Sequence, residues 1–173
     1  TDALRAVGGW DAWNVTEDAD LGFRLWRAGW RLGVINRPTY ESPPETLQDW
    51  LPQRTRWLKG YMQTWGVHTR APLGLGPRGL IALAMTLGVS LAAACVHGPA
   101  LVWLTAALIV ALDAGLTPAT PVAAMVVLIS GAASSWLTCA LGAARAHIPY
   151  HPRDMALAPF YWSLLSLAFV QAL

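Results

Sequence analysis

The sequence predicts a mainly α-helical protein in which a polar N-terminal part precedes a set of membrane-spanning helices. The first observation is the composition. The mean hydropathy is +0.40, and 13% of the residues are charged, whereas a soluble domain carries about 25% charged residues. The second observation is the distribution of charge, because ten of the twelve Lys and Arg and eight of the ten Asp and Glu lie in residues 1–78. The third is a series of four uncharged runs that follow residue 78.

The chain divides into three parts on this basis. Residues 1–42 are expected to be the end of an α/β domain, residues 43–78 an amphipathic interfacial helix and a linker, and residues 79–173 about four transmembrane helices. One strand and two helices cannot bury a core by themselves. We therefore expect the sheet of the α/β domain to be formed by residues that precede Thr1.

Local signals in the first part predict two helices and one strand. A helix over residues 1–7 should end at the Gly8-Gly9 pair. A second helix should begin after Thr16, a favourable N-cap, and end at Gly29, a favourable C′ residue. The alternation of apolar and polar residues over residues 30–36 predicts the strand.

A long helix is expected to open at Glu45 and Thr46 and to contain one proline. Pro52 is best tolerated as the first residue of a helical turn, because its ring fixes φ and it has no N–H to donate. We therefore expect a kink or a restart of the helix after Leu51.

One face of this helix carries polar chemistry. Gln53, Arg56, Trp57 and Gly60 follow the i, i+3, i+4, i+7 spacing and share a face. A guanidinium pairs with phosphate oxygens, and an indole offers an apolar platform for a sugar ring. The same stretch also has the composition of a helix at a membrane surface. Periodicity alone favours the membrane-surface interpretation, and both interpretations can hold at once.

The membrane part contains four uncharged runs, and a span needs about 20 apolar residues. The first, third and fourth runs are long enough to cross a bilayer, and the second is short. Residues 97–99, His-Gly-Pro, are expected to turn the first two runs into a hairpin. The runs cover residues 79–96, 99–112, 122–144 and 155–173.

Three short motifs carry a resemblance to a known family. Residues 53–57 read Gln-Arg-Thr-Arg-Trp, which fits the pattern Gln-x-x-Arg-Trp. Upstream, residues 8–11 read Gly-Gly-Trp-Asp and residues 16–18 read Thr-Glu-Asp. In this order, and followed by hydrophobic spans, the motifs resemble those of membrane-bound, family-two inverting glycosyltransferases, the group that includes cellulose, hyaluronan and chitin synthases. The resemblance implies that residues 1–42 end a catalytic domain of the GT-A type.

The resemblance implies roles for the acidic residues. Asp18, the last residue of the Thr-Glu-Asp motif, would be the general base that takes the proton of the acceptor hydroxyl. Glu17 would contact the substrate. A structural alternative stands beside this, since acidic residues in the first turn of a helix also complement the helix dipole. Asp20 points about 200° round the helix from Asp18 and is expected to be solvated or structural.

The resemblance also implies roles on the long helix. Arg56 would hold the diphosphate of the donor, and Trp57 would stack on the acceptor sugar. Gln53 would orient both by hydrogen bonds. Arg54 occupies a variable position of the motif and could contact phosphate or lipid equally well.

The implied reaction moves a sugar from a nucleotide-sugar donor, expected to be a uridine diphosphate sugar, to a growing polysaccharide or a lipid. A divalent metal, Mg²⁺ or Mn²⁺, is expected, with its ligands before Thr1 and no metal ligand within the 173 residues. The fragment alone is therefore expected to be inactive. Two alternatives stay open, a non-catalytic membrane anchor or assembly subunit and a non-processive lipid glycosyltransferase. Nucleic-acid binding is set aside, because the basic residues are interleaved with acidic residues and tryptophans.

The expected location is the cytoplasmic membrane, with the catalytic part on the cytoplasmic side, since cytoplasmic segments are rich in Lys and Arg. Four crossings would place Arg145 and Arg153 on the opposite side, against this tendency. Either residues 147–153 lie along the interface or one of the four runs does not cross.

Overall fold

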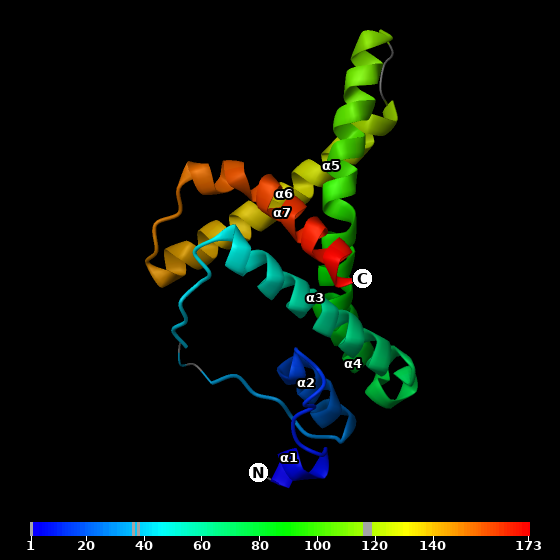
Figure 1. The fold of residues 1–173 in the computed structure, drawn as a ribbon, viewed down its shortest axis with the longest axis vertical. Helices are drawn as coiled ribbons and strands as arrows, with labels where there is room; N and C mark the ends of the chain where they lie inside the picture. The colour runs from blue at the N-terminus through cyan, green and yellow to red at the C-terminus, as the bar shows by residue number, and fades with distance from the viewer. Residues whose placement is uncertain (1, 36, 38, 116–118) are drawn as a thin grey trace. The chain divides into compact units, whose positions relative to one another are not determined.

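The computed structural model describes residues 2–35, 37, 39–115 and 119–173, and the regular elements within them are helices (Figure 1). Two compact units are present, Thr1–Cys95 with Leu167–Leu173, and Val96–Ser166. The elements in order are α1 (Asp2–Ala6), α2 (Glu17–Arg27), α3 (Leu47–Thr69), η1 (Pro72–Leu75), α4 (Gly76–Leu83), η2 (Ala84–Gly88), α5 (Val89–Asp113), α6 (Ala119–Ala146) and α7 (Pro152–Ala172).

The two helices predicted before residue 30 are confirmed. Gly8 and Gly9 follow α1 with φ of 79° and 74°, and Gly29 follows α2 with φ of 80°. Left-handed backbone of this kind favours glycine. Thr16 is the N-cap of α2, but its side chain makes no capping hydrogen bond.

The predicted strand is wrong over residues 30–35, which have no regular secondary structure; Asn36 lies outside the described residues. The end of an α/β domain is therefore not confirmed. A strand needs a hydrogen-bonded neighbour, and the described parts of the chain contain no other strand to pair with it. The apolar side chains of Val34 and Ile35 are 98% and 83% exposed.

Helix α3 is capped by Thr46 and runs without interruption through Pro52. The Thr46 hydroxyl accepts a hydrogen bond from the Asp49 N–H at 3.2 Å and donates one to Asp49 Oδ2 at 2.6 Å. Of the kink or restart predicted after Leu51, the restart is wrong, because α3 is continuous there. The cap fixes the first turn ahead of the proline, so the missing N–H of Pro52 removes a hydrogen bond without ending the helix.

A small apolar core holds α2 and α3 against the segments that follow. Leu75, Leu83 and Leu87 are buried in it, and Phe23, Tyr61, Trp65 and Leu80 pack against them. The Trp26 indole N–H donates a hydrogen bond to the Leu75 carbonyl at 3.0 Å. A Cβ at Gly79 would lie 2.6 Å from Trp26 Nε1, so this glycine lets α4 approach the indole.

Among the described residues, three helical segments are long and apolar enough to cross a membrane: Pro72–Asp113, Pro121–Ala146 and Pro152–Ala172. The predicted number of about four is corrected to three. The hairpin at residues 97–99 is wrong, because α5 continues through them. Gly98 donates its N–H to Ser166 Oγ at 2.8 Å.

Candidate functional site

The loop before α2 is tied to α3 by the side chain of Asn14. Asn14 Oδ1 accepts hydrogen bonds from the Thr16 N–H at 3.0 Å and from Thr16 Oγ1 at 3.2 Å. Asn14 Nδ2 donates to Thr64 Oγ1 of α3 at 2.8 Å. All three residues are buried. Because the Thr16 hydroxyl is used in this way, it does not cap α2.

Gly60 brings the start of α2 against the middle of α3. A Cβ at this position would lie 2.5 Å from Thr16 Oγ1, so no larger residue fits without a shift. Arg56 and Trp57 lie one helical turn before Gly60, a rise of about 5.4 Å. The segment that carries Glu17 and Asp18 therefore begins about one turn of α3 away from Arg56 and Trp57 of the Gln-x-x-Arg-Trp motif. In the chain, the two motifs are 35 positions apart.

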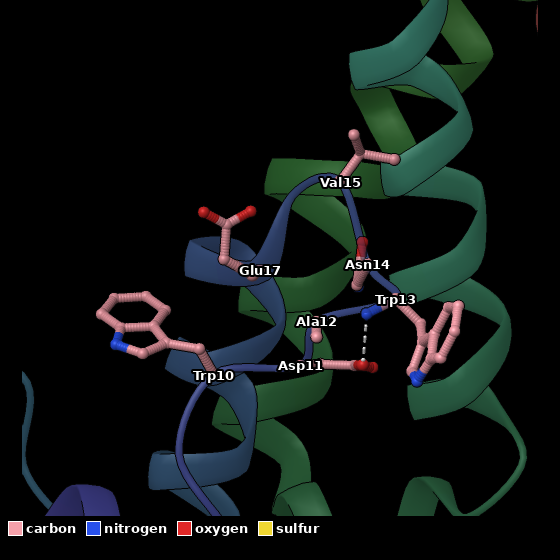
Figure 2. Close-up of a pocket in the computed structure, with 7 residues that line it drawn as sticks. All are labelled: Trp10, Asp11, Ala12, Trp13, Asn14, Val15 and Glu17. Carbon is pink, nitrogen blue, oxygen red and sulfur yellow. Dashed lines mark hydrogen bonds between the residues drawn. The ribbon is translucent and has the colours of Figure 1, made fainter.

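Glu17 lines a shallow hollow of about 590 Å³ in front of α2. In Figure 2 its carboxylate projects on the same side of the loop as the Trp10 indole, and the Trp13 indole lies on the other side, toward α3. The lining consists of Trp10, Asp11, Ala12, Trp13, Asn14, Val15 and Glu17. The Trp13 N–H donates to Asp11 Oδ1 at 2.9 Å, which shapes this loop. The hollow offers indole surface and carboxylate oxygens, groups suited to a sugar or another hydroxyl compound.

Asp18 is exposed at the start of α2. Its Oδ1 accepts a hydrogen bond from the N–H of the next residue, Ala19, at 2.8 Å. Asp18 lines neither the hollow beside Glu17 nor the hollow described next. Its role as general base stays a prediction.

Gln53 and Arg56 share a second hollow, of about 420 Å³, beside the first turns of α3. The Arg56 side chain is exposed, and Gln53 Oε1 is buried without a hydrogen-bond partner. The exposed guanidinium of Arg56 can bind phosphate oxygens, whereas the buried Gln53 Oε1 is closed to a ligand in this conformation. The lining consists of Ser42, Pro44, Gln48, Asp49, Pro52, Gln53 and Arg56.

The Arg54 guanidinium stacks on tryptophans of its own helix. Its central carbon lies 4.3 Å from the ring centroid of Trp57 and 5.7 Å from that of Trp50. Neither Arg54 nor Trp57 lines either hollow. Trp57 remains 38% exposed. The arrangement suits Arg54 to holding the Trp57 indole in place.

A buried polar network joins the rest of α2 to α3. Asp20 Oδ1 lies 3.0 Å from His68 Nε2, and Arg24 Nε donates to Asp20 Oδ2 at 2.6 Å. Arg27 donates from Nε to His68 Nδ1 at 3.1 Å and from Nη2 to the His68 carbonyl at 2.8 Å. Because Nδ1 accepts, the neutral imidazole carries its proton on Nε2 and donates it to Asp20. Burial lowers the pKa of His68 below its ordinary value of 6.5, although the hydrogen bond and charge of Asp20 act in the opposite direction.

Sequence reasoning did not identify this network. Asp20 is structural and not solvated, since it is 3% exposed. The available signal was the spacing of Gly60, Thr64 and His68, which are four residues apart and therefore lie along one stripe of a helix. The residues on the α2 side that meet this stripe could not be read from the sequence.

No metal site is formed by the residues that the structure describes. Nowhere among them do three His, Cys, Asp or Glu side chains gather as ligands of one ion would. No chemical step is assigned to a metal held by these residues alone.

Comparison with known proteins places the chain in a family. The family model described as glycosyl transferase family group 2 matches residues 1–170. A beta-monoglucosyldiacylglycerol synthase of Synechocystis sp. is 36% identical over 77 residues, which are 42% of this chain and 16% of that protein. A probable glycosyltransferase of Bacillus subtilis, YdaM, is 36% identical over 58 residues, which are 33% of this chain and 14% of that protein. No solved structure matches. With its family match over nearly the whole length, the chain belongs to glycosyl transferase family group 2.

Proposed function

We propose that the chain is part of an inverting glycosyltransferase that transfers a sugar from a nucleotide-sugar donor, a uridine diphosphate sugar, to an acceptor hydroxyl at the membrane surface. The observation that carries the proposal is the docking of Thr16 on Gly60. Thr16 opens the Thr-Glu-Asp segment, and Gly60 lies one turn of α3 after Arg56, which lines the second hollow together with Gln53.

The proposed reaction assigns one step to each group. Asp18 takes the proton of the acceptor hydroxyl, and the oxygen attacks the anomeric carbon from the face opposite the leaving group. The bond between that carbon and the diphosphate oxygen breaks, and its electron pair leaves with the nucleoside diphosphate. Arg56 neutralises the charge that develops on the diphosphate. Gln53 orients the substrates by hydrogen bonds.

Three further residues bind or orient the substrates in this proposal. Trp57 offers its exposed ring face to the acceptor. Arg54 covers the ring and keeps it oriented. Glu17 accepts hydrogen bonds from hydroxyl groups in the hollow that it lines.

A lipid hydroxyl is the proposed acceptor. One relative is named for the synthesis of monoglucosyldiacylglycerol, a glycosylated lipid. Three apolar helical segments follow the site along the chain, which would keep it at the bilayer surface where such a lipid lies. A growing polysaccharide, as in the cellulose-synthase-like enzymes, is the second candidate, supported by the Gln53 to Trp57 motif. Product length separates the two: a single lipid-linked species supports the first and a ladder or long polymer supports the second.

The remaining parts of the proposal concern the whole protein. The matched segments span 16% and 14% of the two relatives. We propose that residues outside these 173 bind the nucleotide and a divalent metal, Mg²⁺ or Mn²⁺. The fragment by itself would then transfer no sugar. The proposed location is the cytoplasmic membrane, with the site on the cytoplasmic side.

The test uses the full-length protein in membranes with a radiolabelled uridine diphosphate sugar. Asp18→Asn and Arg56→Gln are each expected to lower transfer about 10²-fold or more, since general-base and charge-stabilising groups contribute at this scale. The matched controls are Asp2→Asn and Arg31→Gln, which alter exposed residues of the same types. Normal turnover in both site variants would instead support a non-catalytic anchor.

A further inference from the structure

We propose that Thr64 and His68 are positioning residues that set the distance between the Asp18 carboxylate and the diphosphate group at Arg56. This inference rests on the proposed function. The two residues form, with Asn14, Asp20 and Arg27, the buried set of hydrogen bonds between α2 and α3 described above, here named the α2–α3 polar contact.

Burial makes this contact directional and hard to rearrange. Thr64 is fully buried, and His68 and Asp20 are 1% and 3% exposed. A buried donor or acceptor that loses its partner costs more free energy than the hydrogen bond contributes, because water cannot replace the partner. Each of these side chains therefore accepts only a narrow range of positions for α2 along α3.

Asp18 lies between the two places where α2 is held. Thr16, two residues before it, packs on Gly60 and bonds to Asn14. Asp20, two residues after it, bonds to His68. The backbone of Asp18 is thus fixed relative to α3, and its side chain accepts a hydrogen bond from the adjacent Ala19 N–H.

The same helix carries the groups that would bind the donor. Gly60, Thr64 and His68 continue the face of α3 on which Gln53 and Arg56 lie. A shift of α2 along α3 would therefore change the separation of the base and the leaving group directly. Misplacement of a reacting group by about 1 Å can cost on the order of 10²-fold in rate.

Paired variants of the full-length enzyme test the proposal. Thr64→Val keeps the side-chain shape but removes the hydroxyl that accepts from Asn14, and Thr64→Ser keeps the hydroxyl. We expect Thr64→Val to lower kcat for transfer roughly tenfold or more, with KM for the nucleotide sugar changed by less than about twofold, since Arg56 is untouched. Thr64→Ser should restore most of kcat.

A second pair covers the case in which Thr64→Val fails to fold. His68→Gln keeps an N–H for Asp20 and a carbonyl for Arg27, whereas His68→Leu removes both. The expected result is a kcat near that of the wild type for Gln and a large loss for Leu, at equal donor KM. A kcat equal to the wild type for Thr64→Val or His68→Leu overturns the inference, as does a loss in the matched Ser or Gln variant of the same size. Failure of the proposed function is distinguishable, because the wild-type enzyme would then transfer no sugar at all.

Discussion

Arg54 and Arg56 stand two residues apart on α3 and have different surroundings. Arg54 covers the ring of Trp57, and its Nε is buried without a hydrogen-bond partner. Arg56 is exposed and lines a hollow with Gln53. The two arginines of one motif thus differ: Arg54 holds an indole, and Arg56 is open to a ligand.

This difference leads to a prediction for Arg54. Arg54→Gln removes a cation–π contact worth about 1 kcal/mol at a partly exposed site. We expect KM for the acceptor to rise roughly three- to fivefold, with KM for the nucleotide sugar unchanged. Initial-rate kinetics of the full-length enzyme with each substrate varied in turn provide the measurement. Arg56→Gln is the comparison, and a larger effect of Arg54→Gln on the donor KM than on the acceptor KM would contradict the assignment.

Asp18 and Asp20, in the first turn of α2, also differ in their surroundings. They point about 200° apart on the helix. Asp20 is buried between His68 and Arg24, and Asp18 is exposed. Residue type and dipole arguments treat the two acids alike, so their different surroundings follow from which side of α2 meets α3.

At the scale of elements, the contact between α2 and α3 consists largely of hydrogen bonds between buried polar side chains. Leu21 of α2 and Leu58 of α3 are buried, and so are five polar residues of this region, Asn14, Thr16, Asp20, Thr64 and His68. This interface should therefore respond to pH.

The pH prediction follows from His68. Its pKa is lowered in the folded protein, so the unfolded chain binds a proton at a higher pH than the folded chain. The free energy of unfolding should be unaffected by this group well above pH 6.5, and should fall as the pH is lowered below about 6.5 toward the folded pKa.

Thermal unfolding of the detergent-solubilised protein between pH 8 and pH 5 measures this dependence. His68→Gln should flatten the decrease in midpoint temperature. His151→Gln, at an exposed histidine, should leave it unchanged. An equal slope in the wild type and in His68→Gln would refute the prediction.

At the scale of the whole molecule, the number of spanning helices decides which loops share a side of the membrane. With three spans, two crossings precede residues 147–151, so these residues lie on the same side as the polar part. With four spans, three crossings precede them, and they lie on the opposite side. Arg145 and Arg153 then lie on the side where basic residues are enriched. Of the two alternatives left by the sequence, this favours one run failing to cross as a separate span.

Cysteine labelling tests the topology. With the free Cys95 and Cys139 changed to Ser, Ala114→Cys should react with a membrane-impermeant maleimide in intact cells. With the polar part on the cytoplasmic side, as proposed, Ile148→Cys should react only after permeabilisation, because two of the three candidate spans return the chain to that side before residue 148. The reverse pattern would indicate four crossings.

The sequence by itself determined the features that depend on neighbours along the chain. The ends of α1 and α2 follow from Gly8, Gly9 and Gly29, whose conformations are local. The apolar segments and the resemblance to family-two glycosyltransferases were also visible, because hydrophobicity and residue order need no fold, and the family match confirms the family.

Only the tertiary structure decided the features that depend on distant partners. Residues 30–35 alternate like a strand but find no neighbour strand in the described regions, and α5 passes through Pro99 where the sequence predicted a turn. The contact of His68 with Asp20 joins positions 48 apart. Burial and hydrogen-bond partners of this kind arise only when helices pack, and no local pattern specifies which face of α2 lies against which turn of α3.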